Sequence, residues 1–372
     1  MTTKSRFPSR RQVLQGVGGV ALAGTAVNTT SLLSALAADK TIIGFVYEGP
    51  RQDLGFNSSL SRAAKIISDS VGAKLIEQEN VPATLAADKV IKGMIELDQA
   101  NVVFATSFGY WESILRLAPS YPNVLFGHMG ALWKPGDPKN ALGYRGYLEE
   151  PHYLAGIIAA RLSKTKKIGF VGAKPLYFIY NNCNALLLGA RSIDPNMQCN
   201  AIITGDWNNP VKEAEAVNSL IDRGCDVIML NADSCKVGVE VAERRGVMSC
   251  GYHYDLSSLA PKGFLTGAEW RWEKGGEFVK AWLNKQPFPN MLRGGFKENM
   301  VAMSPYGPLV TENIRAEVEK VKQGIIADTT RIYTGPLKDN KGNEMVAAGK
   351  SISNEDNAFK MSVKSFVEGV IG

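Results

Sequence analysis

A four-residue strand signature that occurs twice is the feature that most constrains the fold of this chain. Ile43-Gly44-Phe45-Val46 recurs as Ile168-Gly169-Phe170-Val171, about 125 residues further along. Each copy is an apolar, β-rich run that leads into Gly- and Pro-containing sequence, as expected for a buried strand that ends in a loop. This spacing is too long for a solenoid repeat and matches the size of one domain. The repeat therefore predicts two similar α/β lobes, and 372 residues are enough for both.

Strand-like and helical patterns alternate along both halves of the chain. The apolar runs that predict strands are 41–47, 74–78, 102–106, 124–128, 167–172, 199–204, 226–230, 247–251, 263–268 and 299–303. Helical patterns separate most neighbouring runs, and the stretch from Tyr144 to Ala173 is predicted to form a helix, a basic loop and a strand. This order predicts an α/β protein made of two Rossmann-like lobes with parallel sheets and right-handed crossovers.

The N-terminus has the three parts of an export signal. Ser9-Arg10-Arg11-Gln12-Val13-Leu14 resembles the twin-arginine consensus, an apolar Gly/Ala-rich run follows, and Ala35-Leu36-Ala37 is a small-x-small cleavage site. We therefore expect the Tat pathway to export the chain, with cleavage of residues 1–37 near Ala37, and we favour the periplasm as its location. An ordinary apolar N-terminal helix is the alternative. No other apolar run is long enough to span a bilayer, so the mature chain is not expected to be membrane-inserted.

Charge and motif content exclude several classes of function. The formal charge is +6, but residues 1–37 hold four basic residues and no acid, which leaves 38 basic against 36 acidic residues. A balance this close to neutral gives no reason to expect nucleic acid as a partner. The G-x-G-x-x-A match at 16–21 follows no strand, and no metal or cofactor motif occurs elsewhere, so we expect neither a metal nor a cofactor. The five cysteines lack C-x-x-C spacing and are predicted to be buried, although one disulfide after export remains an alternative.

Aromatic and acceptor side chains collect in the loops that follow the predicted strands. Ligands of open parallel sheets bind outside the carboxyl ends of the strands, so these loops form the candidate site. Their aromatic members are Phe56, Phe108, Tyr110, Trp207, Tyr252, Tyr254, Trp270 and Trp272. Their polar members include Asn57, Asn231, Asp233, Asp255 and Glu269. Aromatic faces hold a flat ring and single acids or amides bind its edge, so these loops, which hold few Lys and Arg residues, predict a flat heterocycle with N–H groups.

An ordered set of five motifs resembles the BMP (basic membrane protein) or PnrA-like family of substrate-binding proteins of ABC importers. The motifs are Asp53–Asn57, Ser107–Tyr110 together with Tyr121–Phe126, Glu150–Gly156, Thr165–Gly172 and Gly224–Ile228. The resemblance runs from about Thr41 to Gly335. It implies a type I periplasmic-binding fold that closes on a purine nucleoside or nucleobase, with an ABC permease of the inner membrane as partner. A monomer without enzymatic activity is expected.

The resemblance also implies how the lobes are assembled and which residues bind the ligand. Residues 38–148 plus 264–298 are expected to form the first lobe, and 149–263 plus 299–372 the second, with hinges at 147–150, 263–264 and 296–300. The positions that match the family's ligand residues are Phe56, Asn57, Phe108, Trp207, Asp233 and Asp255. Tyr110 and Trp270 are added from the loop pattern, and Glu150 because it opens the interlobe helix and is expected to face the cleft.

One departure from the family pattern bears on the ligand. Leu265-Thr266-Gly267-Ala268-Glu269-Trp270 resembles the family's L-T-S-x-x-K, and Trp270 stands where the family has a lysine that is associated with ribose. The aromatic residue weakens a ribose site, so a free base, adenine first, is favoured over a nucleoside. Only one of Trp270 and Trp272 is expected to face the cleft, because the two alternate along the chain.

Structural and functional alternatives remain open at this stage. Phe56 and Phe108 are also suited to core packing. The acids Asp233 and Asp255 and the amide of Asn57 are suited to capping a helix or a turn. Glu150 is suited to a salt bridge with Arg145 or His152. A purine nucleoside is the alternative ligand. An exported nucleoside-processing enzyme that uses His253 with Asp255, or His128 with Glu150, is an alternative of another class, as is a receptor-coupled sensor subunit.

Overall fold

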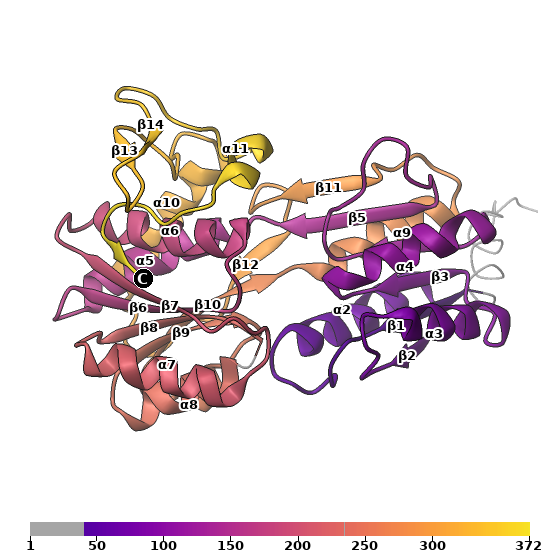
Figure 1. Ribbon diagram of the computed structural model, residues 1–372, viewed down its shortest axis with the longest axis horizontal. Coiled ribbons are helices and arrows are strands. Elements are labelled where there is room, and N and C mark those ends of the chain that lie inside the picture. The colour runs from indigo at the N-terminus through magenta and orange to yellow at the C-terminus, as the bar shows by residue number, and fades with distance from the viewer. Residues whose placement is uncertain (1–40, 234) are drawn as a thin grey trace, which may run out of the picture.

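Two α/β lobes joined by three crossovers make up this protein, as Figure 1 shows. The structure is a computed structural model that describes residues 41–233 and 235–372, so the predicted export signal lies outside the described residues. No helix in the described part of the chain is both long and apolar enough to cross a membrane. The prediction of an α/β protein with two mostly parallel sheets is confirmed.

The first lobe contains a six-stranded sheet with neighbouring strands parallel. Its order is β11 (Met291–Gly294), β5 (Ala141–Gly146), β4 (Leu125–His128), β3 (Val102–Ala105), β1 (Ile42–Val46) and β2 (Lys74–Gln78). The helices of this lobe are α2 (Phe56–Val71), α3 (Leu85–Glu96), α4 (Trp111–Leu117) and α9 (Gly275–Leu283). Both β3 and β4 are buried along their whole length, which explains why their sequences read as continuous apolar runs.

The second lobe contains a seven-stranded sheet that is parallel except at one edge. Its order is β12 (Val301–Met303), β10 (Phe264–Trp270), β9 (Met248–His253), β8 (Val227–Asn231), β6 (Lys167–Gly172), β7 (Gln198–Ile203) and β15 (Val370–Ile371), with β12 antiparallel to β10. The helices are α5 (Glu149–Leu162), α6 (Tyr177–Arg191), α7 (Pro210–Asp222), α8 (Cys235–Arg244) and α10 (Glu312–Ile326). All five cysteines are buried and free, as predicted.

The repeated strand signature marks equivalent positions in the two sheets. The first copy forms β1, which lies between β2 and β3, and the second forms β6, which lies between β7 and β8. Each copy is therefore the first strand of its lobe and is flanked on both sides by parallel neighbours. This position explains why both copies are apolar and why both lead into loops at the carboxyl edge of a sheet.

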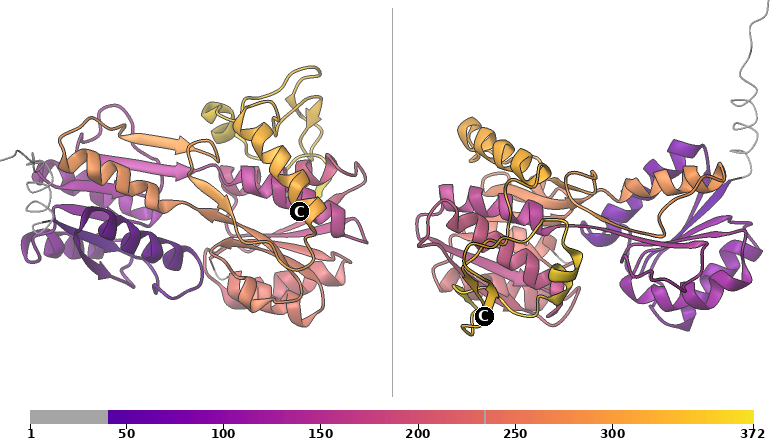
Figure 2. Two further views of the ribbon diagram at one scale, coloured as in Figure 1. Left: turned by 180° about the vertical axis from the view of Figure 1, so that it is seen from behind. Right: turned by 90° about the horizontal axis from the view of Figure 1, so that it is seen from above.

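The chain passes between the lobes after β5, after β10 and between β11 and β12, and Figure 2 shows the narrow connection that results. The predicted crossover at 263–264 is wrong, as is the assignment of residues 264–270 to the first lobe. Strand β10 pairs in parallel with β9 and in antiparallel with β12, so the chain leaves the second lobe only after Trp270. All seven residues of β10 are buried in this sheet, so the strand is an integral part of the second lobe.

Two strands of the first lobe, β5 and β11, did not emerge from the sequence pattern. Residues 144–146 were predicted to open a helix, whereas the structure begins α5 at Glu149 and places Ala141–Gly146 in β5. This strand contains Gly143 and Gly146, and glycine lowers the tendency of a segment to form a strand. Only tertiary pairing with β4 and β11 makes the segment extended.

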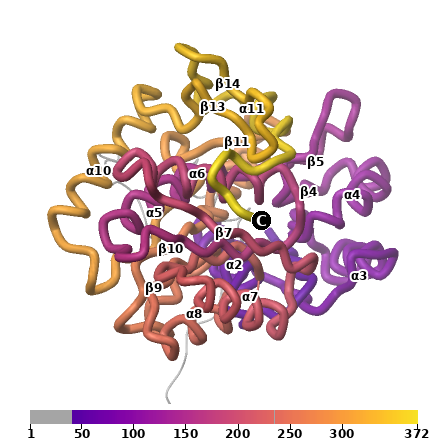
Figure 3. The backbone as a smooth tube through the Cα atoms, turned by 60° about the vertical axis from the view of Figure 1, so that its left-hand side comes forward, coloured from indigo at the N-terminus to yellow at the C-terminus, as the bar shows by residue number. Residues whose placement is uncertain are grey.

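The C-terminal segment after α10 packs on the second lobe. It contains the small antiparallel pair β13 (Leu337–Lys338) and β14 (Glu344–Val346), the short helix α11 (Asn357–Ser362), and β15. Figure 3 shows this segment beside α6, with its end next to β7. Buried amides of α6 hold it there, because Asn181 Nδ2 donates to the carbonyl of Lys360 at 2.8 Å and Asn184 Oδ1 accepts from Val367 N at 2.8 Å. Helix α11 itself is short and ends at Ser362.

Candidate ligand-binding site

A cavity of about 240 Å³ lies between the two lobes, at the carboxyl edge of both sheets. The first lobe and the crossover at Trp272 contribute Glu48, Gly49, Phe56, Asn57, Ser107, Phe108, Met129, Arg145 and Trp272. The second lobe contributes Phe178, Trp207, Asn208, Asp233, Tyr252, His253 and Trp270. Because the walls come from both lobes, a ligand in this cavity contacts both lobes at once.

The structure brings six of the nine sequence-predicted ligand residues into this cavity. They are Phe56, Asn57, Phe108, Trp207, Asp233 and Trp270. Five of the six follow a strand end, and Trp270 is itself the last residue of β10. The rule that ligands bind outside the carboxyl ends of parallel strands therefore located most of the cavity wall.

The other three predicted residues, Tyr110, Glu150 and Asp255, lie outside the cavity. Tyr110 is buried beneath the loop after β3 and donates its hydroxyl proton to the carbonyl of Val81 at 2.5 Å. Asp255 accepts a hydrogen bond from Ser257 N at 2.9 Å, which is the turn-capping role considered as its alternative.

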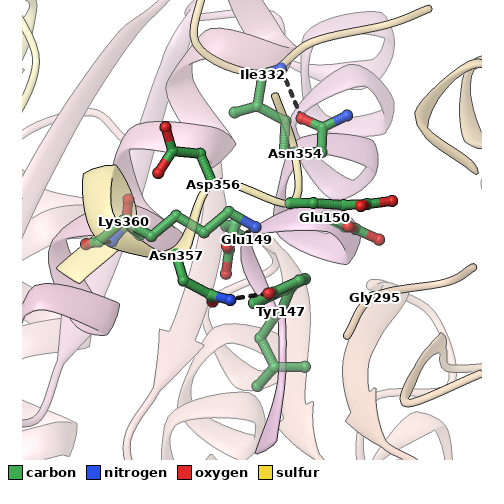
Figure 4. Close-up of polar contacts among 12 residues, drawn as sticks. Tyr147, Glu149, Glu150, Gly295, Ile332, Asn354, Asp356, Asn357 and Lys360 are labelled. Carbon is green, nitrogen blue, oxygen red and sulfur yellow. Dashed lines mark hydrogen bonds and ion pairs between the residues drawn. The ribbon is translucent and has the colours of Figure 1, made fainter. Parts of the chain in front are cut away.

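Glu150 occupies the hinge rather than the cleft (Figure 4). Its carboxylate accepts a hydrogen bond from Phe296 N at 2.7 Å, and so links the first crossover to the third. A Cβ atom on Gly295 would lie 2.1 Å from the Glu150 carboxylate oxygens, so any other residue at this position would displace the carboxylate. Burial is the main cause that raises the pKa of Glu150 to about 8. Neither Arg145 nor His152 forms the salt bridge with Glu150 that the sequence left open, and Lys360 is the cation that favours its ionised form.

The loop before α2 fixes the amide of Asn57 at the cavity. Asp53 caps this helix: one carboxylate oxygen accepts from Gly55 N and Ser58 N at 2.8 and 2.9 Å, and the other from Asn57 N at 3.0 Å. The same second oxygen accepts from Asn57 Nδ2 at 2.8 Å, which orients the amide. Asp53, and not Asn57, therefore performs the capping that the sequence suggested for Asn57.

The two lobes meet at the loop that contains Gly55. A Cβ atom on this residue would lie 2.4 Å from the carbonyl oxygen of Asp233 in the second lobe, so glycine allows the close approach. The ring of Phe56, the next residue, lies 5.4 Å from that of His253 and 6.0 Å from that of Trp272. The start of α2 thus closes one side of the cavity against the loops after β8 and β9.

A hydrogen-bonded relay runs from Trp270 through His253 to Asp233. Trp270 Nε1 donates to His253 Nδ1 at 2.7 Å, and His253 Nε2 lies 3.0 Å from Asp233 Oδ1. Since Nδ1 accepts from the indole, the proton of the neutral imidazole is on Nε2, which donates to Asp233. Burial holds the pKa of His253 well below its usual value. The relay therefore fixes the orientation of the Asp233 carboxyl.

Asp233 is the acidic group of the cavity whose ionisation is most disfavoured. Burial is the main cause that raises its pKa well above the usual range, and the negative charges of Asp53 and Glu48 add to the effect. A ligand that donates an N–H hydrogen bond to this carboxyl favours its ionised form and opposes that effect. Asp233 is thus suited to bind an N–H edge.

Flat aromatic faces make up much of the cavity wall. The rings of Phe178 and Trp207 are parallel within 6°, with centroids 6.0 Å apart, and those of Trp270 and Trp272 stack at 4.4 Å. Both of these last two tryptophans line the cavity, so the expectation that only one faces the cleft is wrong. The reason is that β10 ends at Trp270 and the chain turns at Arg271, which breaks the alternation of a strand. Phe108 keeps 43% of its surface exposed, which is unusual for a phenylalanine.

Arg145 is the residue of this cavity that sequence reasoning missed most clearly. It lies on β5, and its guanidinium carbon is 3.7 Å from the ring centroid of Phe178. The sequence predicted a site poor in Lys and Arg, and Arg145 is the one basic residue among the described residues that line the cavity. Arg145 is the residue before the last one of β5 and so lies at the carboxyl edge of the sheet, where ligands bind. Had β5 been recognised as a strand, its position would have made Arg145 a candidate ligand residue.

Two mostly parallel sheets, three crossovers and an interlobe cavity define the type I periplasmic-binding fold. A solute-binding protein of an ABC transporter system from Aeropyrum pernix K1 shares this fold, with a TM-score of 0.66 at 18% identity over 87% of this chain and 96% of that chain. Residues 40–335 match the family described as ABC transporter substrate-binding protein PnrA-like. The chain belongs to this BMP family of ABC transporter substrate-binding proteins, as its motifs indicated.

Two relatives of similar length have names that state a ligand. A purine-binding protein of Brucella abortus (strain 2308) is 30% identical over 342 residues, which cover 91% of this chain and 95% of that protein. A Haloferax volcanii protein that bears the name of an ABC transporter glucose-binding protein is 26% identical over 329 residues, which cover 88% of this chain and 80% of that protein. Relatives of similar length therefore carry names for chemically different ligands.

Proposed function

We propose that this protein is the periplasmic substrate-binding protein of an ABC importer and that it captures a free purine base. The observation that supports this most strongly is the combination of parallel aromatic faces with the oriented acceptors Asn57 and Asp233 in one interlobe cavity. Aromatic faces bind a flat ring, and such contacts contribute roughly 0.5–1.5 kcal/mol each beyond area burial. The name of the Brucella abortus relative points to the same ligand class.

The size and composition of the cavity favour a free base over a nucleoside. Its volume of about 240 Å³ is below the range of roughly 300–1,000 Å³ that is typical for drug-sized ligands. No lysine is among the described residues that line it, and the indole N–H of Trp270 is already bonded to His253. Trp270 is thus not free to bind ribose hydroxyls in the place of the family's lysine.

Capture follows from the division of the cavity between two lobes. Phe56, Asn57 and Phe108 belong to the first lobe, whereas Trp207 and Asp233 belong to the second. A ligand makes both sets of contacts only in the closed arrangement, so it shifts the population toward closure about the three crossovers. The closed protein then presents surfaces of both lobes together to the permease. We expect it to act as a monomer after Tat export.

The hydrogen bonds of His253 and His128 support a binding protein over an enzyme. His253 pairs with Asp233 and Trp270, not with Asp255, and both of its ring nitrogens are already hydrogen bonded. His128 is likewise bonded on both sides, to Gly130 N at 3.1 Å and to the carbonyl of Ser107 at 3.0 Å. Burial holds the pKa of His128 at about 4. General acid–base chemistry needs a group free to exchange its proton with a substrate, and these two are not.

Mass spectrometry of the small molecule released by denaturing the purified protein tests this proposal. It is combined with calorimetric titration of free purine bases, the matching nucleosides and glucose into protein refolded without ligand. We expect a released purine base and micromolar or tighter binding of at least one base, with weaker binding of its nucleoside. Binding of glucose without binding of any purine would overturn the proposal, and turnover of a nucleoside would revive the enzyme alternative.

A further inference from the structure

Arg145 presents hydrogen-bond donors inside the cavity that no protein group uses. Among the arginines in the described part of the chain, it is the one not exposed to solvent that makes neither a hydrogen bond nor an ion pair. Arg271 and Arg293, which have similar exposure, bond to Glu273 and to the carbonyl of Ala131. An arginine carries five N–H donors in a fixed plane, so Arg145 keeps a complete donor fork for a ligand.

Aromatic rings hold this guanidinium by its face and leave its edge available. The guanidinium carbon lies 3.7 Å from the ring centroid of Phe178 and 5.2 Å from that of Trp270. A cation over a ring uses its charge and its flat face, whereas its N–H groups point outward in the plane of the guanidinium. Because Arg145 comes from the first lobe and both rings from the second, this contact also sets its position across the cleft.

The charge of Arg145 is not neutralised by the acids of the cavity. No ion pair joins it to Glu48, Asp53 or Asp233 within the described chain. Burial is the main influence on the pKa values of His253 and Tyr252. The positive charge of Arg145 also acts on both groups and lowers each of these pKa values. The cavity thus has a cationic region at Arg145 that is separate from the acceptors at Asp233 and Asn57. A ligand that fits both regions has acceptors on one edge and N–H donors on another.

We propose that this cavity selects 6-oxopurines, such as hypoxanthine, guanine and xanthine, over adenine. This inference rests on the proposed function, a free purine base as ligand. A 6-oxopurine presents O6 and N7 on one edge as two acceptors in the plane of the ring, and an arginine fork binds this pair with two parallel hydrogen bonds. Adenine presents N7 beside an amino group on the same edge, and the amino group would face the N–H groups of Arg145.

The remaining groups of the cavity suit the other edge of a 6-oxopurine. Its ring N–H groups are donors, and Asp233 and the carbonyl oxygen of Asn57 are acceptors held in place by His253 and Asp53. Adenine is the first expectation from the sequence, which did not place Arg145 in the site, and the donor fork of this residue in the cavity favours a 6-oxopurine instead.

Calorimetric titration with hypoxanthine and adenine tests the inference, because these bases have nearly the same shape and differ at N1 and position 6. The variants are Arg145→Gln and, as a matched control, Arg223→Gln, which changes an exposed arginine outside the cavity. We expect wild-type protein to bind hypoxanthine at least about tenfold more tightly than adenine, since a bidentate arginine contact discriminates by this amount. R145Q should lose about tenfold or more in affinity for hypoxanthine and little for adenine, whereas R223Q should keep the wild-type ratio.

The outcomes separate this inference from the proposed function. Adenine binding as tightly as hypoxanthine, or an unchanged ratio in R145Q, would overturn the selectivity for 6-oxopurines and leave the purine-binding function standing. Binding of neither base would overturn the proposed function, and this inference with it. Circular dichroism establishes whether R145Q is folded. If it is not, the wild-type affinities for hypoxanthine and adenine alone decide the question.

Discussion

Lys360 and Glu149 form a buried ion pair that ties the C-terminal segment to the first crossover: Nζ and Oε1 are 2.7 Å apart, and the side chains are only 6% and 7% exposed. Figure 4 shows Lys360 reaching from α11 toward the start of α5. The ammonium group also lies 3.4 Å from the ring centroid of Tyr147, whose hydroxyl donates to Asn357 Oδ1 at 2.7 Å. The C-terminal segment therefore supports the hinge and does not cover the cavity.

Loss of Lys360 is predicted to destabilise the protein strongly. Lys360→Met would leave the Glu149 carboxylate buried without its partner, and removal of one member of a buried pair costs about 3–5 kcal/mol. Urea unfolding followed by circular dichroism measures the change. Lys297→Met is the matched control, because Lys297 pairs with Glu355 where both side chains are more than half exposed, and such a pair contributes only about 0–1 kcal/mol. Equal effects of the two substitutions would contradict the structural role of Lys360.

The hinge carboxyl Glu150 is predicted to make stability depend on pH. Its pKa is about 8 in the folded protein and near 4.5 in an unfolded chain, so the folded state binds more protons between these values. Its contribution is fully present below about pH 4.5 and is lost as the pH rises through about 8. Glu150→Gln keeps the shape and an oxygen for Phe296 N but cannot ionise. Thermal unfolding from pH 5 to 9 should show a wild-type melting temperature that falls relative to that of E150Q. A difference that stays constant over this range would disprove the prediction.

The central strands and most of the ligand cavity were predictable because they depend on local patterns. Strands β1 and β6 read as apolar runs since both of their faces are buried, and the loops after such strands converge at one edge of a sheet. Strand β5 was not predictable in this way, because its two glycines hide its pattern and its extended form depends on pairing with β4 and β11. Arg145 was missed with it.

Contacts between segments far apart in the sequence were beyond sequence reasoning. Glu150 looked like a cleft residue because it opens the interlobe helix, yet its partner is the backbone of Phe296, 146 residues away. The pairing of Lys360 with Glu149 has no sequence signal either, since both are charged residues of a kind that is usually exposed. The relay from Trp270 to Asp233 similarly requires β8, β9 and β10 to be adjacent, which only the sheet order reveals.

An ion pair between the lobes is predicted to favour closure. Arg62 on α2 lies 3.2 Å from Glu269 on β10, and the other carboxylate oxygen of Glu269 accepts from Ser304 Oγ at 2.6 Å. Arg62→Ala removes this link without touching the cavity, so a smaller fraction of the protein is closed and the apparent affinity for the ligand falls. A partly exposed pair is worth up to about 1 kcal/mol, which corresponds to a loss of roughly fivefold or less. Titration calorimetry measures the affinity, and X-ray scattering without ligand should show a larger radius of gyration. Unchanged scattering and affinity would exclude this role.

Trp207 is predicted to supply an aromatic face for the ligand. Its ring is parallel to that of Phe178 within 6° and lines the cavity from the second lobe. Trp207→Ala removes both the face and its apolar area, so we expect the affinity for purine to fall by about tenfold or more, since stacking adds roughly 0.5–1.5 kcal/mol to the contribution of burial. Trp207→Phe keeps a ring and should retain most of the affinity. Trp282→Ala serves as the control, because Trp282 packs on Phe288 away from the cavity. If Trp207→Ala bound purine as well as wild type, the ligand could not lie against this face, and stacking would have to involve the tryptophan pair Trp270 and Trp272 instead.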